Sequence, residues 1–293
     1  MSTARAARPA IAREDRIVVP YRRVSVAALM ANTILVLLGG FFVLPMLWMI
    51  FASVDSNPDW AIKLPNLTLS NFVDVLTTAG ALTSFRASLI LAGTTTVVTT
   101  VLAMLAAYPL SRHHIPLRRT FMLVILFASG LPVSMLLVPV YQLYVTLGWL
   151  DSLYTTALFL AASSLPFAIW LMKNFIDAVP EELEHAAAID GASTFRILRQ
   201  LILPLTLPGI AVTSIYTFIQ AWGAFLIPFV LNSNPDDQPG PIEIYNFMGS
   251  HGLFKFGDLA VFSLLFSLPV VALYLLMSRY FSGAFNFSGA VRG

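Results

Sequence analysis

The sequence predicts an all-α integral membrane protein with six transmembrane helices. Two observations predict it: the composition, and hydrophobic runs as long as a bilayer is thick. Of the 293 residues, 58% are hydrophobic and 11% are charged, and the mean hydropathy is +0.80. Soluble domains carry about 25% charged residues, so this composition favours a lipid environment. The chain contains no cysteine, so disulfide bonds are excluded.

Six runs free of charged residues are the predicted spans, since about 20 apolar residues cross the hydrocarbon core. The first run exceeds the apolar core of a signal peptide, about 7–15 residues, so we expect it to remain as an uncleaved span. The six runs are residues 24–54, 88–110, 120–144, 153–172, 201–231 and 259–278.

The lack of ionisable residues in these runs argues against several function classes. Proton- or ion-coupled carriers keep an ionisable relay in the membrane, and a membrane-embedded enzyme needs polar groups at depth. A passive channel needs rings of charge or a filter loop, and the sequence shows neither. The amides of Gln142 and Gln220 are the candidates for lining a pathway through the membrane, and Trp222 is a third.

The distribution of positive charge predicts the orientation. With a cytoplasmic N terminus, 14 of the 17 Lys and Arg residues lie inside and three lie outside, as the positive-inside rule requires. The three outside are Lys63, Arg86 and Lys255. We therefore expect a basic cytoplasmic tail over residues 1–23, an extracytoplasmic loop over residues 55–87, and a cytoplasmic C-terminal tail over residues 281–293.

A charged stretch, from Pro180 to Gly209, interrupts the apolar sequence on the predicted cytoplasmic side. Pro180 suits the first turn of a helix, and the acidic residues after it complement the positive end of the helix dipole. Alanines continue the helix with high propensity, and Gly191 supplies the turn that ends it. These acidic residues and alanines are Glu181, Glu182, Glu184, Ala186, Ala187 and Ala188.

A second helix is expected directly after the glycine, capped by Ser193 or Thr194. Its apolar residues share one face, so we expect it to lie along the membrane surface and to lead into the fifth span. They are Phe195, Leu198, Leu201, Ile202 and Leu205. We call the two helices and the glycine turn between them, within residues 180–205, the elbow. The alternative for the elbow is an amphipathic segment that lies at the membrane interface and docks with no partner protein.

Catalytic and metal-binding patterns are missing from the sequence. It has no G-x-x-x-x-G-K-[ST] nucleotide loop and no G-x-S-x-G elbow. His113 and His114 lie in a basic loop without an accompanying Cys, Asp or Glu, so a solvated surface role outweighs a metal site. We expect no enzymatic activity, no metal and no cofactor.

The spacing of the elbow resembles a known family. His185-Ala-Ala, three residues, Gly191, nine residues and Leu201-Ile-Leu203-Pro204 resemble the cytoplasmic EAA loop of binding-protein-dependent ABC importer permeases, which reads Glu-Ala-Ala, three residues, Gly, nine residues, Ile-x-Leu-Pro. "DGAS" from Asp190, "AWGAFLIPFVL" from Ala221 and the ending "SGAVRG" are similar to the carbohydrate permeases, in particular the maltose-type second permease subunit. His185 in place of the first glutamate, and Gly223-Ala224 in place of Asn-Glu, depart from the family pattern.

The resemblance implies a type I importer permease of the bacterial cytoplasmic membrane, with a core over residues 88–280 and a coupling loop over residues 173–200. It implies a second permease subunit, two ATP-binding subunits and an extracytoplasmic solute-binding protein as partners, beside membrane lipid and without nucleic acid. A carbohydrate is the implied solute, and a non-sugar solute such as glycerol 3-phosphate is the alternative.

The resemblance also implies roles for individual residues. Leu203 and Pro204 join the coupling loop to the fifth span, and Tyr245, Asn246 and His251 are candidate contacts for the binding protein in an outer loop over residues 232–258. The residues implied in coupling to the ATPase are Glu181, Glu182, Glu184, His185, Ala186, Ala187, Asp190 and Gly191.

Overall fold

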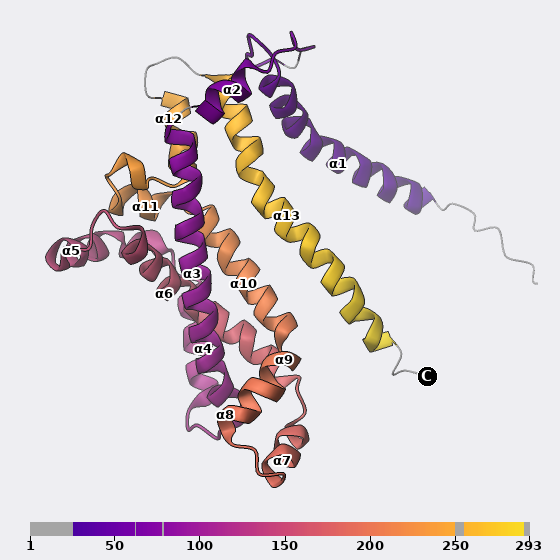
Figure 1. Ribbon diagram of the computed structural model, residues 1–293. Helices are drawn as coiled ribbons and strands as arrows, with labels where there is room; N and C mark the ends of the chain where they lie inside the picture. Colours follow the sequence, from indigo (N-terminus) through magenta and orange to yellow (C-terminus); the bar gives the residue numbers. More distant parts are fainter. Residues whose placement is uncertain (1–25, 62, 78, 250–254, 290–293) are drawn as a thin grey trace, which may run out of the picture. The chain divides into compact units, whose positions relative to one another are not determined.

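The computed structural model describes residues 26–61, 63–77, 79–249 and 255–289, and these are almost entirely helical (Figure 1). In chain order the elements are α1 (Val26–Ser53), α2 (Ser70–Thr77), α3 (Ala79–Arg112), α4 (Arg118–Ser129), a 3-10 turn (Val133–Leu136), α5 (Leu137–Leu147), α6 (Leu153–Asp177), α7 (Glu181–Ile189), α8 (Thr194–Ile197), a π-helical turn (Leu198–Ile202), α9 (Leu203–Leu205), α10 (Leu207–Trp222), α11 (Leu226–Leu231), a second 3-10 turn (Pro235–Asp237), α12 (Gly240–Gly249) and α13 (Phe256–Gly289).

The chain divides into two compact units, residues 1–47 and residues 48–293. The described part of the first unit is the N-terminal part of α1, which belongs to a candidate span of mean hydropathy 2.5. The expected tail over residues 1–23 lies outside the described residues. All packing described below lies within the second unit.

Within the part of the chain that the structure describes, four helices are long and apolar enough to cross a membrane, namely α1, α3, α6 and α13. The predicted count of six is reached when each of two bent helix pairs is taken as one span. The third and fifth predicted spans are therefore bent helix pairs.

The third predicted span breaks at Gly130 and Pro132 into α4 and a second segment, which are bent by 87°. Proline lacks the backbone N–H that a continuous helix needs, and it disfavours helical geometry at the preceding residue. The fifth predicted span bends by 72° at Thr206, between Pro204 and Pro208. The same predicted span is interrupted again at Gly223, between the end of α10 and the start of α11.

The loops expected outside the spans contain helices of their own. Helix α2 and the first turns of α3 occupy the expected loop over residues 55–87, so Arg86 is helical. Helix α12 and the start of α13 occupy the expected loop over residues 232–258. Helix α13 continues to Gly289, through most of the expected C-terminal tail. Buried apolar side chains explain the helices α2 and α12, because Val75 of α2 and Ile242 of α12 are buried against the core and favour a helix over an open loop.

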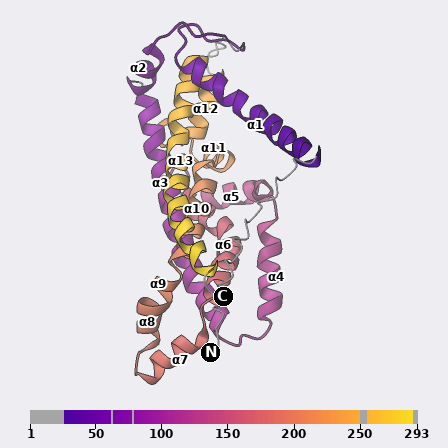
Figure 2. The ribbon, with the colours of Figure 1, turned by 90° about the vertical axis from the view of Figure 1, so that its right-hand side faces the viewer.

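Helix α3 packs against α6, α10 and α12 and runs from the end that carries α2 and α12 to the end that carries α7 (Figures 1 and 2). It packs against α6 through alanines that are fully buried, Ala103 and Ala107 among them, next to Ala168 of α6. Small residues let helices approach closely in a membrane, and hydroxyls add bonds between them. Thr100 of α3 and Ser214 of α10 are 3.1 Å apart at their hydroxyl oxygens.

Gly209, in the first turns of α10, marks another close approach between helices. A Cβ atom at this position lies 2.5 Å from Cγ of Phe175 on α6. We expect Gly209→Ala to lower the stability of the solubilised protein by about 1–3 kcal/mol, because overpacking displaces neighbours. Gly93→Ala is the matched control, since no atom lies within 4 Å of its Cβ. Thermal unfolding in detergent measures both, and a Gly209→Ala protein that melts at or above the wild type contradicts the packing argument.

The segment that follows α1 is organised around the buried carboxylate of Asp55. Its Oδ1 accepts the backbone N–H groups of Asn57, at 3.2 Å, and of Asn66, at 3.1 Å. The ammonium of Lys63 lies 3.5 Å from Oδ2. Burial opposes ionisation of Asp55, but these donors outweigh it, so the pKa of Asp55 lies below its usual value.

A lowered pKa means that the carboxylate of Asp55 stabilises this segment at neutral pH and that the stabilisation is lost as the pH falls through the folded-state pKa. We expect hydrogen exchange in residues 54–68, corrected for its intrinsic pH dependence, to rise on acidification. In the Asp55→Asn variant the exchange is already fast at neutral pH and changes little with acid. Equal protection of the two proteins at neutral pH contradicts the assignment.

Candidate functional site

The elbow forms a short helix at one end of the second unit, as the sequence predicts. Helix α7 begins after Pro180, and its last turn closes on Gly191, which has a φ of 83°. The N–H of Ala192 donates to the carbonyl of Ala187 at 3.0 Å, a pattern typical of helix C-termini that end on a left-handed residue. No atom lies within 4 Å of a Cβ at Gly191, so the requirement for glycine comes from its backbone conformation.

Glu184 does not face solvent as the other acidic residues of α7 do. Its side chain is 10% exposed, and Oε1 accepts the Nε–H of Arg112 at 2.5 Å. Oε2 accepts the hydroxyl of Tyr108 at 3.0 Å. Arg112, 8% exposed at its side chain, also donates to the carbonyl of Val179 at 2.8 Å. The expected role of Glu184 as an acidic contact for a partner is therefore replaced by an internal pair with the end of α3.

A second set of polar contacts joins the neighbouring helix ends. The Ser111 hydroxyl donates to Asp177 at 2.5 Å and ties the last turn of α3 to the last residue of α6. Asp177 also pairs with Lys173, one turn earlier on α6, and lies 3.9 Å from Arg118 at the start of α4. The ends of α3, α4, α6 and α7 thus form one polar cluster.

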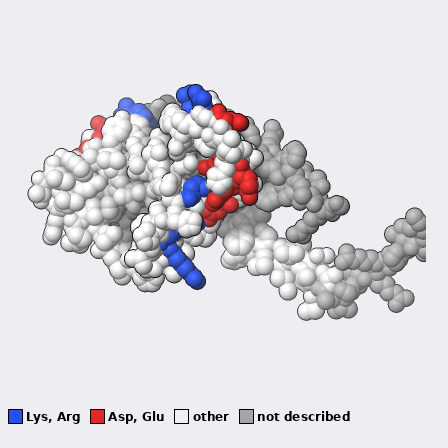
Figure 3. All heavy atoms as spheres, turned by 90° about the horizontal axis from the view of Figure 1, so that it is seen from below, with Lys and Arg blue, Asp and Glu red and all other residues white. Residues whose placement is uncertain are grey.

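The outward face of α7 combines acidic and apolar residues. Glu181, Glu182, His185 and Ala186 are exposed, and Ile189 is 87% exposed. Seen from the end that carries α7, Asp and Glu side chains gather in a patch next to Lys and Arg side chains (Figure 3).

Ala187, expected on the outward face, is half-buried and packs against the apolar cluster of α3, α6 and α8. It lies three residues after Glu184 and therefore on the same side of the helix. Asp190 is exposed and follows the last residue of α7.

The second helix of the elbow differs from the expected one. Ser193 caps α8 as predicted, accepting the N–H of Arg196 at 3.4 Å, but a π-helical turn follows from Leu198. Ile197 and Ile202 are buried against the core, while Phe195 and Leu205 of the predicted apolar face are exposed. Leu203 and Pro204 lie in α9, directly before the 72° bend.

The three pathway candidates lie in different surroundings. Gln142 on α5 and Gln220 on α10 are exposed. Trp222 is buried, its ring stacked between Phe218 and Phe266, and its Nε1–H donates to the Phe266 carbonyl at 3.0 Å. The expectation that Trp222 lines a pathway is therefore wrong for this conformation, because the indole fills the core.

The two described candidate contacts for a binding protein also differ in their exposure. Tyr245 on α12 is 54% exposed and packs beside Phe225 and Phe229. Asn246 is half-buried, with its amide 3.3 Å from Glu243. His251 lies outside the described residues.

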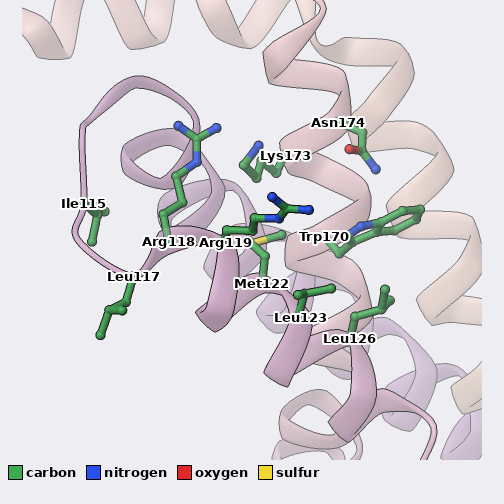
Figure 4. A pocket seen from close by; sticks show the side chains of 10 residues that line it. All are labelled: Ile115, Leu117, Arg118, Arg119, Met122, Leu123, Leu126, Trp170, Lys173 and Asn174. Carbon is green, nitrogen blue, oxygen red and sulfur yellow. The ribbon is translucent and has the colours of Figure 1, made fainter.

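A cavity of about 520 Å³ between α4 and α6 is a feature that the sequence analysis did not predict. Arg119 reaches from α4 toward Lys173 on α6, and Trp170 and Asn174 form the α6 side (Figure 4). Trp170 packs on Phe167, whose ring contacts Tyr216 of α10. Among the described residues, no group of three or more His, Asp or Glu side chains is placed to hold a metal.

Residues 99–283 match the family model described as the inner membrane component of binding-protein-dependent transport systems, which is more than half of the chain. The chain belongs to this family. The family region begins within α3 and contains the whole elbow, so the charged helix α7 is part of a transport component.

Relatives of this inner membrane component align over most of its length. A putative ABC transporter permease protein of Streptomyces antibioticus is 33% identical over 205 residues, which cover 70% of this chain and 89% of the relative. The trehalose/maltose transport system permease of Thermococcus litoralis is 28% identical over 254 residues, 85% and 91% of the two chains. The crystal structure of a bacterial ABC transporter that imports alginate matches with a TM-score of 0.76 at 21% identity, over 88% and 98% of the two chains. This match shows the fold.

Proposed function

We propose that the chain is the permease subunit of an ATP-driven ABC importer and forms half of the pathway by which a carbohydrate enters the cell. The observation that supports this most strongly is the alignment with the trehalose/maltose permease over 85% of the chain, together with the family match. Glycerol 3-phosphate, the alternative solute, has no comparable support among the relatives described above.

The arrangement of the elbow supports a mechanical role for the subunit. A family member that depends on a binding protein needs a second permease subunit to complete the pathway, two ATPase subunits to drive it and a binding protein to deliver the solute. Helix α7 presents its outward face at one end of the unit, and charge and apolar side chains together suit docking into a groove of a partner. In the proposed orientation both chain termini and α7 lie in the cytoplasm, as the positive-inside rule requires.

Reconstitution tests the proposal. The chain is purified with its co-expressed partner subunits and binding protein and placed in proteoliposomes, and uptake of radiolabelled maltose and trehalose is measured with and without ATP. We expect ATP-dependent accumulation of a sugar that requires the binding protein. Accumulation of labelled glycerol 3-phosphate without any sugar uptake supports the alternative, and uptake independent of ATP contradicts an ABC importer.

A further inference from the structure

Helix α7 is joined to α6 by residues 178–180 and packs on the apolar cluster through Ala187, and two further routes lead from it to α10 and α3. One route is the chain itself, through α8 and α9 into α10. The other is the buried pair between Glu184 of α7 and Arg112, the last residue of α3. The proposed function requires that movement of α7 reach the spans, so the stiffer of the two routes decides which span moves first.

The chain route is interrupted at several points. The left-handed turn at Gly191, the π-helical turn from Leu198 and the 72° bend at Thr206 separate α7 from α10. Each interruption is a place where a backbone can change direction, and π-helical turns are frequent at functional sites. A push on α7 is therefore absorbed in part before it reaches α10.

The pair joins α7 to α3 directly, and α3 stays helical through its last turn although Pro109 lies between the two bonded residues. Both oxygens of Glu184 are bonded to α3, one to Arg112 and one to Tyr108, one turn apart on the same helix. Arg112 binds in addition to the Val179 carbonyl, just before α7 begins. The guanidinium has fixed planar geometry, so several bonds from it orient the attached helix as well as hold it.

Helix α3 carries this attachment without a break to the opposite end of the unit. It is a single helix from Ala79 to Arg112, and it contacts α10 through the hydroxyls of Thr100 and Ser214. We propose that Arg112 and Tyr108 are positioning residues that make α7 and α3 one mechanical body, so that displacement of α7 by a partner ATPase is delivered to α3 before it reaches α10. This inference rests on the proposed function.

Distance measurements between spin labels test the inference, and the lack of native cysteine makes the labelling specific to introduced sites. Cysteine is introduced at Ala188 of α7, paired in one protein with Leu105 of α3 and in another with Leu207 of α10; all three residues are exposed. The assembled complex, with cysteine-free partner subunits, is measured in nanodiscs without nucleotide and with ATP, Mg²⁺ and orthovanadate.

We expect the α7–α3 distance to change by less than about 2 Å between the two states, the size of an ordinary helix shift, and the α7–α10 distance to change by more. In the Arg112→Gln background the α7–α3 distance changes as well, and its distribution broadens. Tyr108→Phe, which keeps the ring and removes one bond, gives a smaller broadening and serves if Arg112→Gln does not assemble.

A variant with the two charges exchanged distinguishes loss of the Arg112–Glu184 pair from general damage to the protein. Exchanging the partners, Arg112→Glu with Glu184→Arg, restores a narrow α7–α3 distribution if the pair acts as a clamp. An α7–α3 distance that changes as much as the α7–α10 distance in the wild type overturns the inference, as does an Arg112→Gln protein with a wild-type distribution. A complex in which ATP moves neither pair contradicts the proposed function itself, and the clamp with it.

Discussion

Replacing Ile189 by aspartate lowers the affinity of the chain for its ATPase subunits about 30-fold or more and leaves the chain itself intact. The side chain of Ile189 is 87% exposed on α7, so a charge there meets no neighbour within the subunit. In the complex the same position is expected at a desolvated interface, where an unpaired charge is unfavourable. A central interface residue accounts for about 2 kcal/mol or more, which is roughly a 30-fold loss of affinity.

Co-purification of the ATPase subunits with the tagged chain measures this effect, and ATP-driven uptake in proteoliposomes follows it. Leu64→Asp is the matched control, because Leu64 is 89% exposed and lies far from α7 in the sequence, in the segment after α1. Normal recovery of ATPase with Ile189→Asp, or equal loss with both variants, contradicts docking through α7.

Replacing Glu184 by leucine destabilises the elbow by about 3–5 kcal/mol, because the Arg112 guanidinium stays buried while its remaining carboxylate neighbour, Glu181, is exposed and 3.9 Å away. The Tyr108 hydroxyl loses its acceptor at the same time. We expect a lower midpoint of thermal unfolding of the solubilised chain and increased hydrogen exchange in residues 179–192. Glu182→Leu is the control on the exposed side of the same helix.

The double replacement Arg112→Leu with Glu184→Leu recovers part of the lost stability, since removing both buried charges leaves neither unpaired. A single Glu184→Leu variant as stable as the wild type shows that the pair contributes little. A double variant less stable than the single one points to packing of the two side chains, not to their charges.

The sequence predicted the local features of the elbow because those depend on neighbours in the chain. Pro180, the acidic first turn and Gly191 determine where α7 begins and ends, and the structure confirms each of these. Ser193 caps the next helix for the same reason. The number of apolar runs also followed directly from the positions of the charged residues along the chain.

The residues of the same chain that bind the elbow could not be predicted, because these contacts join residues that are distant in the sequence. Arg112 and Glu184 are 72 positions apart, and no local pattern in the sequence pairs the one with the other. Tyr108 and Arg112, four residues apart at the end of a span, share a helix face and were the available signal. The burial of Trp222 between Phe218 and Phe266 depends in the same way on α13 folding back beside α10.

The angle of each helix break could not be predicted, because hydropathy gives the length of a span and not its direction. Pro132 and the prolines around Thr206 lie in runs that are apolar enough to span, and they mark where the bends occur without giving their size. The π-helical turn from Leu198 has no clear sequence mark, and the burial of Ile197 depends on contacts with distant helices.

Labelling of a single cysteine in place of Ala188 tests the central claim most directly. A membrane-impermeant maleimide is applied to intact cells and to inside-out vesicles, each with and without the ATPase subunits. We predict that the cysteine reacts only in inside-out vesicles, and that bound ATPase subunits protect it at least about tenfold, as burial in a docking groove requires. Reaction in intact cells, or equal reaction with and without the ATPase subunits, would contradict α7 as the helix through which an ATPase moves this protein.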